Sequence, residues 1–161
     1  MKDTISLRGH QALCLLGFRG LGYSPAFVDN MTRVFRRLQD DEATPVRLVS
    51  EVADLCGPCP HLGPAGCGAQ VGPQNRGLRG GPARNGDAEA AMRGRDGAIL
   101  ARLGIGEGET LPWREVKARI AGAIGPQELQ ELCALCPWLS YGYCLQGLRR
   151  LHAAATGASG R

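Results

Sequence analysis

Apolar residues recur at helical spacing along much of the chain. Ser24 followed by Pro25 is typical of a helix start, because serine caps the first turn and proline is tolerated in it. The residues that follow form one apolar stripe at intervals of three, four and seven: Phe27, Val28, Met31, Val34, Phe35 and Leu38. This spacing predicts a helix of about 14 residues.

Similar patterns predict further helices near 10–17, and over 88–103, 112–124, 127–132 and 145–155. The fourth of these six helices opens around Thr110 or Leu111, at Pro112. The alternating sequence VRLVS, residues 46–50, predicts a short strand, and the apolar run that begins at Ile5 leaves room for another. The pattern therefore predicts a mainly α fold.

The length of 161 residues suits one domain, which we place at residues 1–155. Residues 68–86 are rich in glycine and proline, and we expect them to form a flexible insertion. The polar tail, 156–161, is expected to be disordered.

A repeated cysteine motif is the strongest chemical signal in the chain. Residues 56–67 read CGPCPHLGPAGC and residues 133–144 read CALCPWLSYGYC. Both copies consist of Cys, two residues, Cys-Pro, one residue, Leu, four residues and Cys. A CxxC turn presents two sulfurs on one side of a loop, and the third cysteine can fold back over a shared metal. We expect a small irregular helical domain with a short β element and two cysteine-rich metal-binding turns.

Closed metal sites usually need four ligands, while each turn supplies three. The three cysteines of the first turn are Cys56, Cys59 and Cys67, and those of the second are Cys133, Cys136 and Cys144. One more cysteine, Cys14, lies four residues after His10, so both share a face of the predicted first helix. Cys14 could instead be a buried apolar residue, and His10 a capping residue.

Three ligand arrangements follow from these eight residues. In the first, Cys14 completes one triplet and His10 completes the other. In the second, one cluster has four cysteines and the other keeps an open iron. In the third, the two CxxC pairs form one zinc-ribbon site. The spacing alone fits one or two [4Fe-4S] clusters and zinc equally well.

The net charge and the number of cysteines indicate which kinds of partner and which cellular compartment to expect. The net charge of +4 is mildly basic, and the arginines within 68–86 have no interleaved aromatic residues, which argues against nucleic acid. No signal peptide or membrane span is visible, so we expect a cytoplasmic protein with no membrane partner. Seven cysteines cannot all pair within one chain, and clustered cytosolic cysteines favour metal binding.

The motifs together resemble a prokaryotic family, domain of unknown function 1284, whose members are described as iron–sulfur-binding. The resemblance covers LRGHQALCLLGFRGLGYSPAFVDNM at 7–31, both cysteine motifs, and LGIGEGETLPW at 103–113. His10 and Cys14 match the family's opening LRGHHLLCLLGFRG, whereas Gln11 replaces its second histidine. The resemblance implies iron–sulfur binding rather than zinc, and it implies no particular activity.

These observations favour a small redox protein that passes single electrons to a partner protein. No Ser–His–Asp set, dinucleotide fingerprint or P-loop is present, so an enzyme is the less favoured class, and the sequence does not identify whether a small-molecule substrate exists. Arg8 is a candidate donor of hydrogen bonds to cluster sulfur. The alternatives are a catalytic or sensing cluster with an open iron, and a zinc-stabilised binding module.

Overall fold

The computed structural model describes residues 3–68, 87–134, 136 and 138–159. The helices are α1 (Gly9–Leu16), α2 (Pro25–Asp40), α3 (Asp87–Leu103), α4 (Trp113–Ala123), α5 (Pro126–Leu132) and α6 (Tyr143–Ser159). The strands are β1 (Ile5–Arg8), β2 (Pro45–Val49), β3 (Leu62–Gly63), β4 (Gly66–Cys67) and β5 (Thr110–Pro112). The described residues also form two short 3-10 helices, η1 (Asp54–Cys56) and η3 (Leu139–Tyr141). The predicted mainly helical fold is confirmed.

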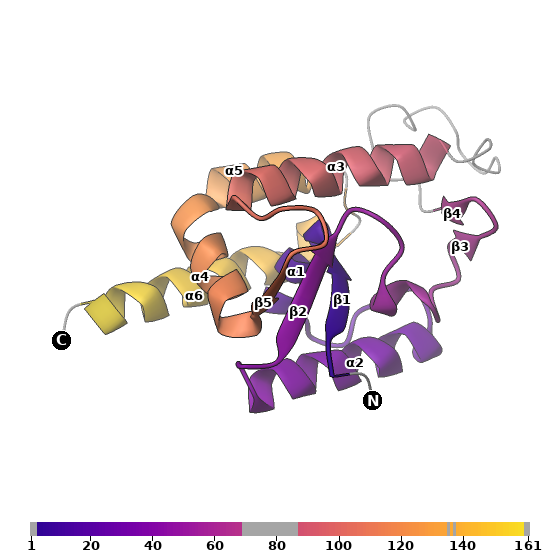
Figure 1. Cartoon of the computed structure of the whole chain (residues 1–161). Helices are drawn as coiled ribbons and strands as arrows, with labels where there is room; N and C mark the ends of the chain where they lie inside the picture. The colour runs from indigo at the N-terminus through magenta and orange to yellow at the C-terminus, as the bar shows by residue number, and fades with distance from the viewer. Residues whose placement is uncertain (1–2, 69–86, 135, 137, 160–161) are drawn as a thin grey trace.

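A small mixed sheet lies at the centre, in the order β1-β2-β5. Strand β1 pairs in parallel with β2, from Ile5 opposite Val46 to Arg8 opposite Val49. Strand β5 pairs antiparallel with the other edge of β2. Helix α3 runs along the upper end of this sheet and α2 along its lower end, with α1, α4 and α6 behind it (Figure 1).

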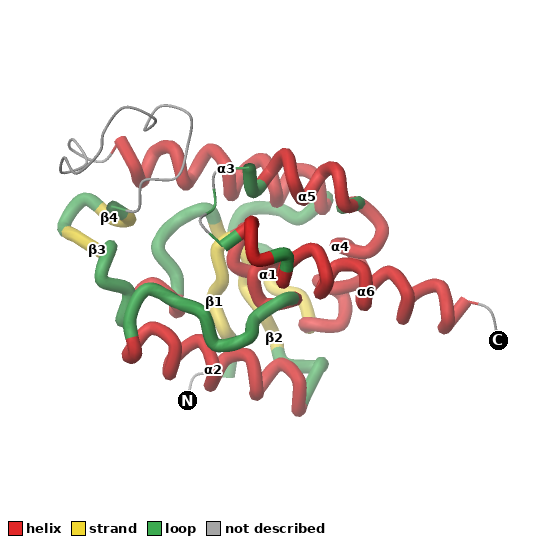
Figure 2. The backbone as a smooth tube through the Cα atoms, turned by 180° about the vertical axis from the view of Figure 1, so that it is seen from behind, coloured by secondary structure: helices red, strands yellow, loops and turns green. Residues whose placement is uncertain are grey.

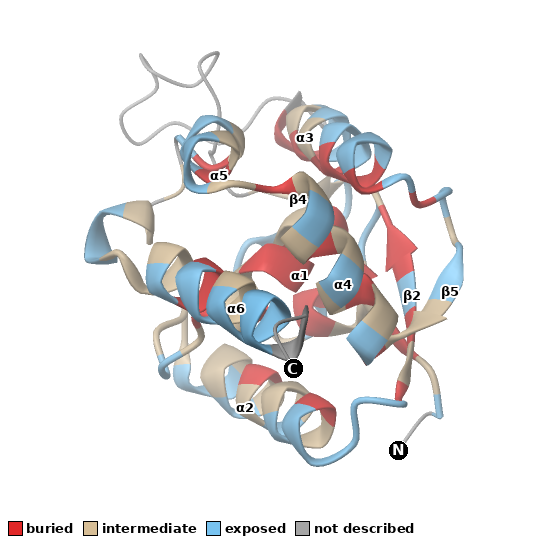
Figure 3. Ribbon diagram, turned by 90° about the vertical axis from the view of Figure 1, so that its left-hand side faces the viewer, coloured by how far each residue is buried: buried red, intermediate tan, exposed pale blue. Residues whose placement is uncertain are grey.

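Helix α1 is the central helix of the molecule. It follows β1 directly, and five of its eight residues are buried: Gly9, Gln11, Ala12, Leu13 and Leu15. The view from behind shows α1 in front of the sheet and beside α6 (Figure 2). Burial colouring places α1 in the interior, behind α6 and α4 (Figure 3). Side chains on α1 are therefore held by packing on several sides.

One hydrophobic core joins the sheet to the helices around it. Its fully buried members include Leu7, Leu13, Leu48, Ile99, Val116, Ile120, Leu129 and Leu148. The predicted stripe on α2 contributes Met31 and Leu38, which are buried. Ser24 caps that helix as expected, accepting a hydrogen bond from the amide of Phe27 at 3.2 Å. The core thus fixes the elements from which the cysteines project.

The fourth helix begins one residue later than predicted, after a short strand that the pattern did not predict. Residues Thr110–Pro112 form β5, and the helix begins only at Trp113. Pairing with β2 satisfies the backbone of Thr110 and Leu111, and the amide of Trp113 donates to the carbonyl of Thr44. The helix keeps the predicted apolar stripe, because Trp113, Val116 and Ile120 are buried.

Two further predictions concern the insertion and the tail. Except for Gly68, the predicted flexible insertion at 68–86 lies outside the described residues. Of the predicted tail, residues 156–159 belong to α6, and 160–161 are not described. Among the helices of the described ranges, none is both long and apolar enough to cross a membrane.

Candidate metal centre

The two cysteine motifs fold into the same turn. In the first copy, the amide of Cys59 donates to the carbonyl of Cys56 at 3.0 Å, and the amide of Leu62 donates to the carbonyl of Cys59 at 3.1 Å. In the second copy, the corresponding distances from Cys136 to Cys133 and from Leu139 to Cys136 are 2.9 and 3.2 Å. The sequence repeat is therefore also a structural repeat.

The copies diverge after the shared leucine. The first continues into the β3–β4 hairpin, which ends at Cys67. The second forms η3 and then enters α6, which carries Cys144 in its first turn. In both, the chain turns at a glycine with positive φ, Gly66 at 100° and Gly142 at 75°, a conformation that favours glycine. Different elements thus return the third cysteine in each copy.

Cys14 lies with the second triplet. A hydrogen bond shared with Cys144, together with burial and the nearby thiols of Cys136 and Cys133, raises the pKa of Cys14. The same hydrogen bond lowers the pKa of Cys144, against the effect of burial. Four thiols from α1, the CxxC turn and α6 therefore form one group, which we call the four-cysteine group: Cys14, Cys133, Cys136 and Cys144.

Arg95 of α3 is the cation beside the four-cysteine group. Its Nη2 lies 3.9 Å from the sulfur of Cys133. Burial alone would lower the pKa of Arg95, but nearby Cys133, Cys14 and Cys136 raise it. Its Nε is buried and has no hydrogen-bond partner within the described residues. The arrangement thus offers a positive charge and an unused N–H donor to an anionic group.

The first triplet is built separately, and we call Cys56, Cys59 and Cys67 the three-cysteine group. The sulfur of Cys56 is 3.4 Å from both the side-chain amide of Gln11 and the backbone amide of Ala53. Burial raises the pKa of Cys59, and the charge of Cys56 adds to this effect. Cys67 is held through its amide, which donates to Glu89 at 2.8 Å.

A buried ion-pair network connects the start of α1 to α3. Arg8, only 1% exposed, donates to Asp96 at 2.5 Å, to both oxygens of Glu89 at 3.0 Å, and to the carbonyl of Ser50 at 2.8 Å. The predicted role of Arg8 as a cluster donor stays untested, and these acceptors occupy its guanidinium. Glu89 and Asp96 lie two turns apart on α3, a spacing that could have drawn attention to them. Sequence reasoning missed Glu89, Asp96 and Arg95.

His10 is anchored by the same network. Asp96 accepts hydrogen bonds from the backbone amide of His10 at 2.9 Å and from its Nδ1 at 2.7 Å. Burial lowers the pKa of His10, although the charge of Asp96 opposes this. Burial alone would raise the pKa of Asp96, but His10 and Arg8 lower it. The imidazole is therefore neutral near pH 7. Its proton lies on Nδ1, so Nε2 is the ring nitrogen that carries no proton.

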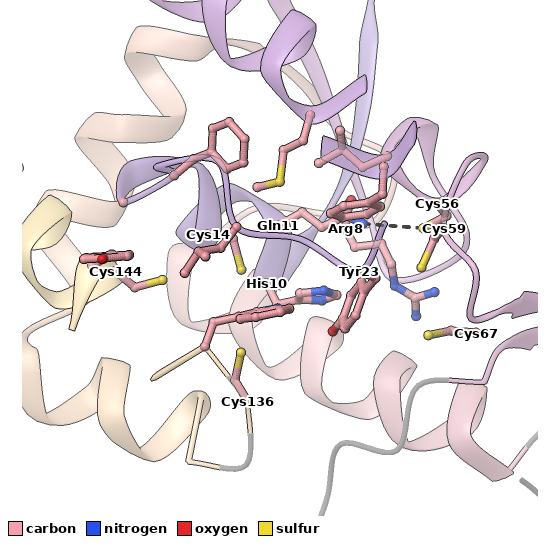
Figure 4. A pocket seen from close by; sticks show the side chains of 18 of the residues that line it. Arg8, His10, Gln11, Cys14, Tyr23, Cys56, Cys59, Cys67, Cys136 and Cys144 are labelled. Atoms are coloured by element: carbon pink, nitrogen blue, oxygen red, sulfur yellow. Dashed lines mark hydrogen bonds between the residues drawn. The ribbon is translucent and has the colours of Figure 1, made fainter. Parts of the chain in front are cut away.

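Both cysteine groups border one cavity of about 100 Å³ (Figure 4). All the cysteines except Cys133 line it, and so do Arg8, His10 and Arg95. Tyr23 separates the two sides, with its ring 4.5 Å from that of His61 and 5.4 Å from that of Trp138. His61 and Trp138 occupy the same position in the two repeats. Burial and nearby Cys136 and Cys14 raise the pKa of Tyr23, so its hydroxyl stays protonated.

The predicted ligand arrangements can now be compared with the geometry. In the zinc-ribbon arrangement, Cys14 and Cys144 would not be ligands. In the structure, these two cysteines instead lie next to each other, beside the second CxxC pair. Within the described part of the chain, no group of three or more His, Cys, Asp or Glu side chains is placed to hold one metal ion. Metal binding by the predicted ligands therefore stays a prediction.

Comparison with known proteins identifies one sequence family. A family model described as a protein of unknown function, DUF1284, matches residues 22–142. The match includes the first cysteine motif and all but the last two residues of the second, and it excludes His10, Cys14 and Cys144. No curated protein and no solved structure matches the chain.

Proposed function

The chain belongs to the DUF1284 family, and we propose that it is an iron–sulfur protein that exchanges single electrons with a redox partner protein. The observation that carries this proposal is the position of Cys14. Helix α1 brings Cys14 next to the second triplet, so that four thiols lie near one another there instead of three. Four thiolates are the usual ligand set of a [4Fe-4S] cluster.

The residues around the four-cysteine group fit an anionic cluster. Ligating cysteines must lose their protons, and a positive charge nearby favours the thiolate form. Arg95 supplies that charge. Burial raises the pKa of Cys133 and Arg95 opposes this rise, while the hydrogen bond with Cys14 and then Arg95 lower the pKa of Cys144. The Nε–H of Arg95, which has no partner among the described residues, is available to donate to a sulfur. When bound, the cluster would supply a centre that accepts and releases one electron.

The cavity also suits a multi-atom group. The sulfurs around a single tetrahedral zinc lie about 3.8 Å apart, because each Zn–S bond is about 2.3 Å long. Cluster thiolates bind separate corners, with the cluster's own atoms between them. Six of the seven cysteines border one cavity (Figure 4), so a group bound there would be within reach of thiols from several elements.

Electron transfer needs a route from the cluster to a partner. Tyr141, 52% exposed, lies 6.2 Å from Trp138 and 5.9 Å from Tyr143, measured between ring centres. Tyr143 directly precedes Cys144, so these rings connect the four-cysteine group to the surface. We place the protein in the cytoplasm, where its free thiols would stay reduced, and we propose neither membrane nor nucleic-acid partners.

The test is oxygen-free purification followed by iron, acid-labile sulfide and zinc analysis, with electron paramagnetic resonance of the reduced protein. We expect a brown protein with about eight irons if both groups hold [4Fe-4S] clusters. Reversible one-electron waves in voltammetry would support electron transfer. A colourless protein with zinc and no sulfide would refute the proposal and favour a zinc-stabilised binding module. Catalysis at an open iron would instead be favoured if a small molecule changed the resonance spectrum.

A further inference from the structure

The end of α1, the loop that follows it and the start of α6 lie together on one side of the molecule, in front in the view from behind (Figure 2). Residues of this side border the cavity beside the four-cysteine group. Arg19 of the loop and Tyr143 of α6 line that cavity together with Cys14 and Cys144. A protein docked on this side would therefore lie next to the four-cysteine group.

The segments that build this side carry charges of one sign. Between Asp3 and Asp29, and again after Glu131, the sequence contains no Asp or Glu. These two stretches include α1, the loop after it and all of α6, so they contribute arginine and no carboxylate. Cations elsewhere are neutralised by neighbours, as Arg119 is by Glu115. The positive charge on this side of the molecule is thus not cancelled by its own segments.

Two exposed arginines are held in place here by neutral groups. The guanidinium of Arg19 lies 4.7 Å from the ring centre of Tyr143 and donates to the side-chain oxygen of Gln146 at 2.6 Å. Arg150, one turn beyond Gln146 on α6, donates to the carbonyl of Leu16 at 3.4 Å. Within the described residues, neither guanidinium pairs with a carboxylate. Both charges are therefore ordered and free to attract an acidic partner.

An exposed aromatic ring lies beside these arginines. Tyr141 is 52% exposed, and its ring centre is 5.9 Å from that of Tyr143. Tyrosine and arginine are enriched at protein–protein interfaces, where the ring packs against the partner and the charges select it. We call this surface the basic face and define it by Arg19, Tyr141, Tyr143, Gln146 and Arg150.

We propose that the basic face is the docking site of the redox partner, and that this partner is a small electron-transfer protein with an acidic surface. The inference rests on the proposed function and adds the chemistry of the partner. In the complex, one electron leaves the reduced cluster at the four-cysteine group and enters the oxidised cofactor of the partner. The arginines attract the acidic surface during approach. Nucleic acid is the less favoured occupant, because among the described residues Tyr141 is the only exposed Phe, Tyr or Trp, and single strands bind to successive rings.

The test uses the full chain, purified without oxygen and reduced, with an oxidised flavodoxin of net negative charge as the probe. Stopped-flow mixing measures the second-order rate constant of electron transfer at increasing salt, and we expect it to fall because salt screens the attraction. Arg19→Glu and Arg150→Glu should each lower it roughly tenfold at low salt, whereas Arg150→Lys should keep most of it. Arg102→Glu is the matched control, because it makes the same charge change at an exposed position on α3, and it should have little effect.

The outcomes separate this inference from the proposed function. Wild-type protein without iron and sulfide would refute both. An iron-loaded protein that does not reduce the flavodoxin, that reduces it at a rate independent of salt, or that is slowed equally by Arg102→Glu and Arg19→Glu would refute only the docking site. Tighter binding of single-stranded RNA than of flavodoxin, lost in Arg150→Glu, would also overturn it and assign the basic face to nucleic acid. Iron content and a resonance spectrum equal to those of wild type show that each variant has folded.

Discussion

Gly147 of α6 rests directly against the carbonyl oxygen of Leu16, the last residue of α1. A Cβ at Gly147 would lie 2.2 Å from that oxygen. The contact is reciprocal, because a Cβ at Gly17 would lie 2.1 Å from the carbonyl oxygen of Tyr143. Each glycine follows a cysteine by three residues, Cys14 or Cys144. Because neither glycine carries a side chain, α1 and α6 approach closely enough for the thiols of Cys14 and Cys144 to contact each other.

We expect Gly147→Ala to separate α1 from α6. The added methyl group meets backbone rather than a flexible side chain, so the helix must shift. Overpacking of this kind costs roughly 3 kcal/mol or less in unfolding free energy when the surroundings adjust. Iron retention at the four-cysteine group should fall as well, because Cys14 and Cys144 move apart. Urea denaturation and iron analysis measure the two effects.

Gly122→Ala is the control for this substitution. Gly122 lies in α4, where an added Cβ would have nothing within 4 Å, so alanine should stabilise the helix by up to about 1 kcal/mol. A Gly147→Ala protein with wild-type stability and iron content would contradict the close-approach argument.

Cys14→Ser should remove one cluster and leave the other. Serine keeps the size and loses the thiolate, so iron should fall by about half if each group holds one [4Fe-4S] cluster. Cys133→Ser should give the same loss, whereas Cys56→Ser should remove the other half. Iron counting on the three variants checks this, and a Cys14→Ser protein with full iron would make Cys14 a packing residue only.

Arg95→Gln should make the reduction potential of the four-cysteine cluster more negative. Reduction adds negative charge next to Arg95, and removing the cation withdraws its stabilisation of the reduced state. Arg95→Lys should recover most of the potential. Arg102→Gln, an exposed position on the same helix, should leave it unchanged. Protein-film voltammetry measures all three, and equal potentials in Arg95→Gln and wild type would rule out this role.

Asp96→Asn should destabilise the fold strongly at neutral pH. The substitution removes one of the two carboxylates that pair with buried Arg8 and leaves Glu89 as the other. Breaking a buried pair costs up to roughly 3–5 kcal/mol. By contrast, Glu115→Gln breaks a half-exposed pair with Arg119 and should cost less than about 1 kcal/mol. Chemical denaturation of the apo-proteins at pH 7 compares them.

The same residue sets part of the acid sensitivity. The pKa of Asp96 is lowered in the folded protein, against the effect of burial. Its contribution is therefore complete above the unfolded-state pKa of about 3.9 and is lost as pH falls through the lower folded value. The stability of Asp96→Asn should decline less steeply than that of wild type below about pH 4. If both proteins lost stability equally steeply in acid titrations, Asp96 would have no role in this decline.

Much of the fold was predictable because its signals are local. Ser24 with Pro25 marks the start of α2, and regular apolar spacing marks the later helices. Strand β5 was not predictable in this way, because Thr110 and Leu111 are strand residues only through pairing with β2. That pairing brings together segments distant in sequence, which periodicity does not record.

The candidate site was also predictable only in part. The repeated motif identified six cysteines and even implied a common turn. Which triplet receives Cys14 depends on the packing of α1 against α6, and the motif carries no information about it. The network around Arg8 was also hidden, because Glu89 and Asp96 resemble ordinary surface charges on α3 until the helix is seen to lie over α1.

The joining of Cys14 to Cys144 has a consequence for biogenesis. During translation, the segment that carries His10 and residues 56–67 leaves the ribosome well before residue 144 does. At ordinary synthesis rates the interval is on the order of ten seconds. Throughout it Cys14 has no partner on α6. Under the proposed function, a nascent chain would therefore acquire iron at its earlier motif first, and the four-cysteine group would be loaded only after α6 has docked.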